Sequence, residues 1–224
     1  MFIDQSMTRR VITIDKEMGI PEAGELMAKN HIRHLPVVES DNKLIGIVTD
    51  RDVRSAMPSV ALNECSPAEK EKFLKLTVKD IMTADVVSIT PLYTLQDALL
   101  LMHETTVGAF PVIDENGILK GIISIRDLMR AFVNVLGIKE SGTLVGVLVD
   151  DKAGQMKKIV DAITEENIST GSILVARHWK DEQQAVFPYL LTMNVTAVKK
   201  KLEKMGFKLI DPMEWYLDQV PKND

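Results

Sequence analysis

The chain has 224 residues, of which 46% are apolar and 26% are charged. This length and composition are ordinary for a globular protein of one to three domains. The net charge of −5 argues against a nucleic-acid partner, because binding to phosphates needs a basic face. The single cysteine, Cys65, excludes an internal disulfide and fits a reducing compartment.

The first residues do not resemble a signal peptide, because the chain is polar again by Asp4. No apolar run approaches the roughly 20 residues that a membrane helix needs. We therefore expect a cytoplasmic protein that has no membrane partner. Metal binding is not expected, because the histidines lack Cys or acidic partners at ligand spacing; they are His31, His34, His103 and His178.

One stretch of sequence occurs twice. The first copy is Leu44-Ile-Gly-Ile-Val-Thr-Asp-Arg-Asp52, and the second is Leu119-Lys-Gly-Ile-Ile-Ser-Ile-Arg-Asp127. Each copy predicts an apolar strand that ends in a hydroxyl residue, followed three residues later by a carboxylate at a helix start. Met7-Thr8 and Met82-Thr83 are separated by the same 75 residues as Asp52 and Asp127, so the duplication covers a whole structural unit.

The first repeat, residues 1–57, predicts an α/β unit. A unit of about 50 residues would be marginally stable alone, which favours two copies packed together. Its expected elements are a strand over 11–14, a helix with an apolar stripe at Ile20, Ala23, Leu26 and Met27, a strand over 35–38, a polar turn over 40–43, a strand over 44–48, and a helix from Thr49 or Asp50 to Met57, ended by Pro58.

Residues 58–76 are expected to be a linker. Its Ser66-Pro-Ala-Glu69 stretch is typical of a capping box and predicts a short helix to Leu76. The second repeat, residues 77–137, replays the first without insertion or deletion. Its expected elements are a strand over 86–89, a helix with Ala98, Leu101 and Met102 on one face, a strand over 110–113, an Asn116-Gly117 turn, a strand from Leu119, and a helix from Ile125 or Arg126 to Leu136, ended by Gly137.

Residues 141–212 predict a third unit with the ferredoxin-like order βαββαβ. Its first strand, 143–149, is apolar throughout and is expected to be buried on both faces. The following elements are a helix with Met156, Ile159, Val160 and Ile163 on one face, a hairpin over 173–177 and 185–193, a helix marked by Val195, Val198, Leu202 and Met205, and a strand over 207–210. Residues 213–224 form a tail, whose Trp215 and Tyr216 would pack on a neighbour or cover the core edge.

The repeated motifs resemble a pair of CBS domains, the Bateman module, over residues 1–137. They are Met-Thr, an apolar-Pro-Val strand, and Gly-Ile-Val/Ile-Thr/Ser-x-x-Asp, each present twice and in the same order. The resemblance implies a pseudo-symmetric module whose central cleft binds AMP, ADP, ATP or S-adenosylmethionine. Such a compound would be a regulatory ligand, and no obligatory cofactor is implied.

The chemistry of the motif agrees with this resemblance. A carboxylate at a helix start can accept hydrogen bonds from ribose hydroxyls, and a nearby Thr or Ser can donate to a phosphate. The helix N-terminus itself favours an anion. Asp52 and Asp127 could instead only cap their helices. We favour nucleotide binding, because capping by an aspartate does not account for the paired hydroxyls.

By this resemblance, each site takes its ribose aspartate from one repeat and its base-lining strand from the other. Arg51 and Arg126 are candidate phosphate contacts. Arg33 can bind phosphate oxygens and its counterpart Gly108 cannot, so the Asp127 site is expected to prefer the more anionic ligand. Against this, Asp15 could repel phosphate. His34 would line the cleft or lie half-exposed at the surface. One site would comprise Thr49, Asp52, Thr90, Val107, Gly108 and Ala109, and the other Ser124, Asp127, Asp15, Ile32, Arg33 and His34.

The third unit resembles an ACT domain at the turn Asp151-x-x-Gly154 and at Asn167, although Ala153 stands where that family usually has proline. The resemblance implies an amino-acid ligand at this turn, across the interface of an oligomer such as a homodimer. A purely dimerising role remains open.

A CBS pair followed by an ACT-like unit resembles the AcuB family of acetoin-utilisation proteins. This implies a non-catalytic sensor that regulates a partner enzyme. The first alternative is a structural scaffold with vestigial sites. A small enzyme is the second alternative, and it is disfavoured because no Ser–His–Asp order or Cys–His pairing can be placed in the chain.

Overall fold

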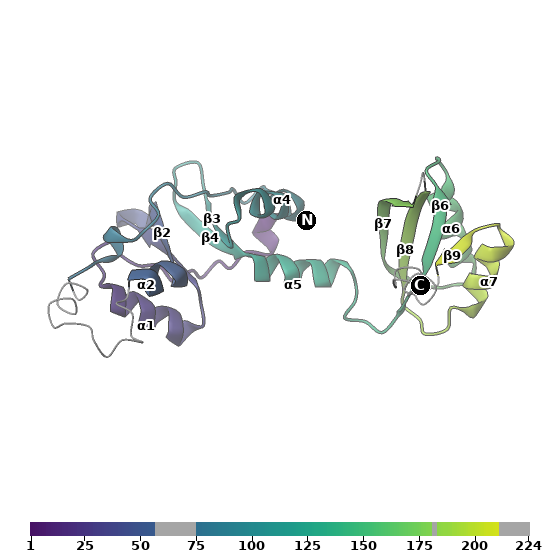
Figure 1. Ribbon diagram of the computed structural model, residues 1–224, viewed down its shortest axis with the longest axis horizontal. Coiled ribbons are helices and arrows are strands. Elements are labelled where there is room, and N and C mark those ends of the chain that lie inside the picture. Colours follow the sequence, from purple (N-terminus) through teal and green to yellow (C-terminus); the bar gives the residue numbers. More distant parts are fainter. Residues whose placement is uncertain (57–74, 181–182, 211–224) are drawn as a thin grey trace, which may run out of the picture. The chain divides into compact units, whose positions relative to one another are not determined.

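A computed structural model of the chain describes residues 1–56, 75–180 and 183–210. The chain divides into two compact units, Met1–Met129 and Arg130–Asp224 (Figure 1). Several sequence predictions lie outside the described residues: the end of the helix at Met57 and Pro58, the linker helix before Lys75, Cys65, and the tail with Trp215 and Tyr216. No helix of the described part is long and apolar enough to cross a membrane.

The first unit contains both repeats up to the first turn of α5, and the regular elements of the repeats follow the predicted order. Short 3-10 turns lie at Ile3–Gln5, Ser40–Asn42 and Val78–Asp80. Repeat 1 has α1 (Ile20–Asn30), β1 (His34–Val38), β2 (Leu44–Thr49) and α2 (Asp50–Ala56). Repeat 2 has α4 (Leu95–Thr105), β3 (Ala109–Ile113), β4 (Leu119–Ser124) and α5 (Ile125–Val135).

The two hairpins have the same register. In β1–β2, Leu35 pairs with Val48 and the ladder shifts between Val37 and Val38. In β3–β4, Phe110 pairs with Ile123 and the shift lies between Val112 and Ile113. The duplication is therefore preserved down to its β-bulge.

The strands predicted over 11–14 and 86–89 are reduced to single parallel bridges, Ile14 to Val37 and Ile89 to Val112. Ile14 N–H donates to the Pro36 carbonyl (3.1 Å), and Val38 N–H donates to the Ile14 carbonyl (3.0 Å). A longer parallel ladder would next need an N–H from Pro36, which proline lacks. Pro111 has the same effect in repeat 2. The prediction of strands here is wrong for this reason.

The first segment of each repeat packs on the other repeat. Thr8 exchanges two backbone hydrogen bonds with Ile122 in β4 (2.9 and 3.0 Å), and Thr83 exchanges two with Ile47 in β2 (3.0 Å each). Val78 of the second segment belongs to the core of repeat 1, together with Ile20, Leu35 and Val48. The two repeats are thus interlocked by a reciprocal exchange of segments.

Two equivalent glycines make this exchange possible. A Cβ added to Gly121 would lie 2.6 Å from Met7 Sδ and 3.0 Å from the Thr8 carbonyl oxygen. A Cβ added to Gly46 would lie 2.7 Å from Met82 Sδ. Only a residue without a side chain leaves room for the exchanged Met-Thr segments.

The second unit has a sheet with α6 and α7 packed against it. Its elements are β5 (Thr143–Leu144), β6 (Gly146–Asp150), α6 (Gln155–Glu165), β7 (Thr170–Lys180), β8 (Gln183–Leu190), α7 (Thr196–Lys204) and β9 (Lys208–Ile210). β8 pairs with β7 on one side and with β5 and β6 on the other, and β6 also pairs with β9; all pairs are antiparallel. This is the split order βαββαβ that the sequence predicts.

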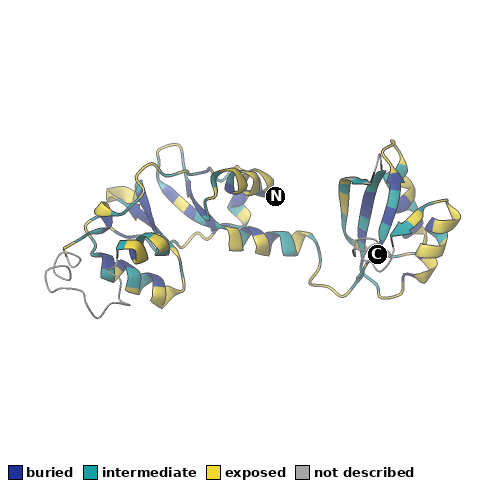
Figure 2. Ribbon diagram, in the orientation of Figure 1, coloured by how far each residue is buried: buried dark blue, intermediate teal, exposed yellow. Residues whose placement is uncertain are grey.

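Some side chains of this unit lie differently from the prediction. In the stretch 143–149, Val145, Val147 and Val149 belong to the core under the helices, whereas Leu144 is 55% exposed. The prediction that this strand is buried on both faces is wrong, because the described helices cover one face of the sheet (Figure 2). Val160 and Met205 are also exposed. Ala162 takes the core position predicted for Val160, and Met205 follows the last residue of α7.

The close approach at Gly121 gives a stability prediction. We expect Gly121→Ala to lower the free energy of unfolding by about 1–3 kcal/mol, because the new methyl group overpacks the Met7-Thr8 segment. Gly19→Ala is the control: its Cβ would meet only Pro21 Cδ at 3.9 Å, and a change within about 1 kcal/mol is expected. Urea unfolding measures both. Equal losses in the two variants would contradict the interlocked packing.

Candidate functional site

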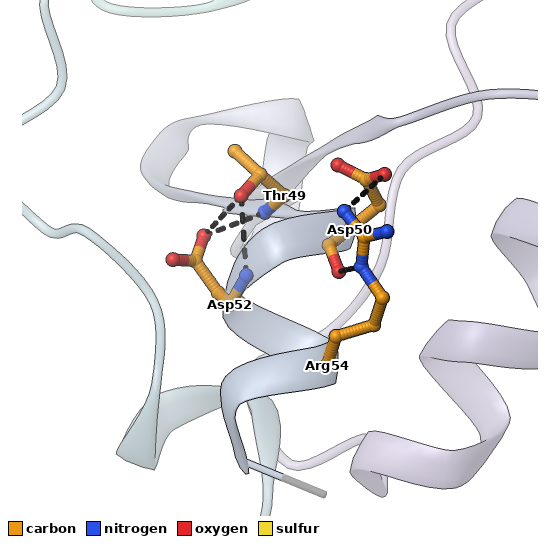
Figure 3. Close-up of polar contacts among 4 residues, drawn as sticks. All are labelled: Thr49, Asp50, Asp52 and Arg54. Carbon is orange, nitrogen blue, oxygen red and sulfur yellow. Dashed lines mark hydrogen bonds and ion pairs between the residues drawn. The ribbon is translucent and has the colours of Figure 1, made fainter.

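The hydroxyl–carboxylate pair of repeat 1 forms a closed local network at the start of α2 (Figure 3). Asp52 Oδ2 accepts hydrogen bonds from the Thr49 backbone N–H (2.8 Å) and from Thr49 Oγ1 (2.7 Å). The Asp52 backbone N–H donates to Thr49 Oγ1 (3.3 Å). Ser124 and Asp127 make the same three contacts in repeat 2, at 3.0, 2.6 and 3.3 Å.

This reciprocal arrangement is a capping box with aspartate as the third helical residue. The same box occurs at two other places, Thr77 with Asp80 and Thr94 with Asp97. Capping therefore accounts for the paired hydroxyls as well as for the aspartates. The sequence argument that these hydroxyls favour nucleotide binding over capping is wrong.

The capping box of repeat 1 uses only one of the two carboxylate oxygens of Asp52. All hydrogen bonds that Asp52 accepts from the described residues go to Oδ2. Its Oδ1 can accept a hydrogen bond from a ligand hydroxyl while the helix stays capped. Capping and ligand binding are compatible in one carboxylate.

A cavity of about 450 Å³ lies beside α1 and α2. Ile32, Arg33, Asp50 and Arg54 of repeat 1 line it, and Arg126 contributes from repeat 2. The structure thus brings together three of the predicted site residues, Ile32, Arg33 and Arg126. Asp127 is the neighbour of Arg126 along α5.

The charges around this cavity are unbalanced. Arg54 donates from its guanidinium to Asp50 Oδ2 (3.0 Å) and to the Asp50 carbonyl (3.1 Å) (Figure 3). Arg33 and Arg126 form no ion pair or hydrogen bond with side chains in the part of the chain that is described. Three guanidinium groups thus face one carboxylate. The cavity suits an anionic group such as a phosphate.

Sequence reasoning missed Asp50 and Arg54, which hold one wall of this cavity. Their spacing of four residues on a helix is the signal that could have found them. The sequence analysis expected Asp15 to repel a phosphate. In the structure, Asp15 Oδ1 accepts a hydrogen bond from the Glu17 backbone N–H (2.8 Å), as in an Asx turn, so part of this carboxylate is engaged locally. Asp15 and Thr90 are both exposed.

His34 lies where the two repeats meet. A Cβ added to Gly108 would be 3.3 Å from His34 Nε2, so residues assigned to different sites are neighbours. Burial lowers the pKa of His34 below its ordinary value, although the charges of Asp50 and Asp52 oppose this effect. Val107 is half-buried and Ala109 is buried at the start of β3.

The turn before α6, where the sequence predicts a likeness to ACT domains, has left-handed backbone at both ends of the helix. Gly154 precedes α6 with φ of 89°, and Asn167 follows it with φ of 55°. Asp151 is exposed. No group of three or more His, Cys, Asp or Glu side chains among the described residues could hold a metal ion.

The capping box predicts different effects for two substitutions of one aspartate. We expect Asp52→Ala to destabilise the protein by about 1 kcal/mol, because the Thr49 N–H loses its acceptor. Asp52→Asn retains one carbonyl oxygen as acceptor, so we expect a smaller loss. Thermal or urea unfolding distinguishes the variants, and an equal loss in both would show that the box does not stabilise α2.

His34 predicts a pH dependence of stability. Its pKa is lowered in the folded protein, so the unfolded chain binds more protons below the ordinary histidine pKa of about 6.5. The free energy of unfolding should therefore fall between pH 7.5 and 5.5, and His34→Gln should reduce this fall. A slope that His34→Gln does not alter would contradict the prediction.

Sequence comparison assigns both repeats to one family. The sequence model of the CBS domain matches residues 3–59 and 78–134. A CBS domain-containing protein of Dictyostelium discoideum is 35% identical over 136 residues, which are 61% of this chain and 94% of that protein. Inosine-5′-monophosphate dehydrogenase of Methanocaldococcus jannaschii is also 35% identical, over 57% of this chain but only 23% of the enzyme.

Solved structures agree with this assignment. A protein assigned as the acetoin utilization protein AcuB of Vibrio cholerae has a TM-score of 0.53 and 27% identity, over 62% of this chain and 95% of that one. CBSX2 in complex with AMP has a TM-score of 0.51 and 27% identity, over 59% and 96%. The CBS domain pair of protein MJ0100, in complex with 5′-methylthioadenosine and S-adenosyl-L-methionine, has a TM-score of 0.50 and 26% identity, over 59% and 95%. The chain therefore belongs to the CBS domain family and carries a tandem CBS pair.

Proposed function

We propose that this protein is a non-catalytic sensor whose CBS pair binds an adenosyl ligand with a phosphate group. The observation that carries the proposal is the cavity of about 450 Å³ with Arg33, Arg54 and Arg126 in its lining. Similar CBS pairs bind AMP in CBSX2 and 5′-methylthioadenosine and S-adenosyl-L-methionine in MJ0100. A phosphate in this cavity would meet two guanidinium groups that no described side chain neutralises.

In the proposed complex, the phosphate, ribose and base of the nucleotide each bind a different part of the CBS pair. The phosphate would bind Arg33 and Arg126, which can each present a planar pair of donors. The ribose would bind the carboxylate of Asp127, which lies next to Arg126 in the first turn of α5. The base would lie along Ile32 and His34 at the start of β1. We therefore favour AMP, ADP or ATP over S-adenosylmethionine for this site.

Regulation requires that the ligand bind one arrangement of the repeats more tightly than another. Arg33 and Arg126 come from different repeats, so a phosphate between them would draw the two repeats together. The regulated partner would be an enzyme, by analogy with CBS modules that form part of enzymes. A scaffold with vestigial sites is the alternative, and the unneutralised arginines weigh against it because clustered like charges without a ligand destabilise a fold.

For the second unit we propose an ACT-like role in homodimer formation or amino-acid binding. Its sheet order and the left-handed backbone at Gly154 and Asn167 support this role. We further propose that the protein acts in the cytoplasm in the regulation of acetoin utilisation, and the similarity of its CBS pair to AcuB supports this role.

Calorimetric titration with AMP, ATP and S-adenosylmethionine tests the proposal. We expect AMP or ATP to bind, and Arg33→Ala or Asp127→Asn to weaken binding by about tenfold or more, because each removes a charge-assisted hydrogen bond. Asp127→Asn keeps an acceptor for the helix cap, so the loss would reflect the ligand. The control is Arg10→Ala, which removes an exposed arginine outside the cavity and should bind normally. Absence of binding by any adenosyl compound would favour the scaffold.

A further inference from the structure

One face of the sheet in the second unit carries apolar side chains that the described helices do not cover. Val147 and Val186 belong to the core under α6 and α7, so their neighbours along each strand point to the opposite face (Figure 2). We call this opposite side the open face. Its apolar residues are half-buried except for Leu174, which is 45% exposed. They are Leu148, Leu174, Trp179, Phe187 and Ile210.

Strand register places these side chains side by side. Ile210 of β9 pairs with Gly146 of β6, and Leu174 of β7 pairs with Phe187 of β8. A Cβ added to Gly146 would lie 2.8 Å from Ile210 Cβ and 3.2 Å from Phe187 Cε1, so the two pairs adjoin. The Trp179 ring meets the Phe187 ring edge-on, with a centroid distance of 5.3 Å. An apolar row thus runs across β9, β6, β8 and β7, from Ile210 to Leu174.

A flanking segment of the same unit already packs on one end of the open face. Tyr189 lies on this face, because it is two residues beyond Phe187 in β8. The Tyr189 hydroxyl donates a hydrogen bond to the Glu140 carbonyl (2.6 Å), and a Cβ added to Gly142 would lie 2.9 Å from Tyr189 Cζ. The stretch before β5 therefore covers the Tyr189 end of the face.

The segment that follows β9 begins at the other end of the apolar row. Ile210 is the last residue of β9, and residues 211–224 continue from it. An extended chain advances about 3.3 Å per residue and neighbouring strands lie about 4.8 Å apart. About five residues are therefore enough to cross the sheet from Ile210 to β7.

The sequence of residues 211–224 matches the open face in character. Apolar residues occupy alternate positions, which an extended segment places on one side; they are Met213, Trp215 and Leu217. Lys208 is exposed on the open face, because it pairs with Leu148. Its charge complements acidic residues of the segment such as Glu214.

We propose that residues 211–224 pack on the open face of their own chain, with Met213, Trp215 and Leu217 against the apolar row. Burial of these apolar side chains favours the contact. The covalent link at Ile210 gives the segment a high effective concentration at this face, so it competes successfully with a second copy of the chain. The segment thereby closes an apolar patch that would otherwise be open to association with other molecules.

Tryptophan fluorescence tests the proposal, because Trp179 and Trp215 are the two tryptophans of the chain. In the variant Trp179→Phe, the signal comes from Trp215 alone. We expect its emission at a shorter wavelength than in the unfolded chain, with slower quenching by acrylamide. In the same background, Leu174→Lys places a charge at an exposed position of the apolar row. It should shift the Trp215 emission to longer wavelength.

The matched control is Val160→Lys, at an exposed apolar position of α6, which lies outside the open face. It should leave the Trp215 emission unchanged, and circular dichroism confirms that each variant is folded. An emission like that of the unfolded chain, or an equal shift in Val160→Lys and Leu174→Lys, would overturn the proposal. An emission that depends on protein concentration would also overturn it, because the occupant would then be a second copy. None of these outcomes depends on adenosyl binding.

Discussion

The CBS pair depends on the close approach of two backbones at Gly46 and Gly121. Each glycine admits a Met-Thr segment that comes from the other repeat, and the paired hydrogen bonds of Thr8 and Thr83 hold those segments in place. Val78, which comes from the second repeat, completes the core of repeat 1, so repeat 1 does not bury its core alone. The candidate site residues of the two repeats are thereby brought together: His34 of repeat 1 meets Gly108 of repeat 2, and Arg126 joins Arg33 at the cavity.

The two repeats share a symmetric backbone but carry different side chains at equivalent positions. The two hairpins share their register and their bulge, and both closing helices begin with the same capping box. Equivalent positions nevertheless carry Arg33 and Gly108, or Arg54 and Met129. The duplicated fold thus presents the same capping carboxylate twice, in two different chemical surroundings.

The duplication made most of the fold predictable, because a motif that occurs twice is hard to misplace. The sequence alone indicated the α-helices and hairpins of the repeats among the described residues, and also the order βαββαβ of the second unit. It did not indicate that Pro36 and Pro111 stop the short parallel strands, because this depends on which strand pairs with which. The paired hydroxyls did not distinguish nucleotide binding from helix capping, because the spacing Thr/Ser-x-x-Asp is also that of a capping box. The sequence did not indicate that Asp50 and Arg54 line a cavity, because this position depends on Arg33 and Arg126, which lie beside them only in the folded chain.

The central claim is that the cavity lined by Arg33, Arg54 and Arg126 holds the phosphate of an adenine nucleotide. A crystal structure of the protein grown with AMP tests it most directly. We expect the phosphate within hydrogen-bonding distance of the Arg33 and Arg126 guanidinium groups, with the ribose on Asp127 and Asp127 still capping α5. A phosphate bound away from both arginines, or a ribose held by Asp52 with the phosphate beside Ile125 and Met129, would contradict the claim.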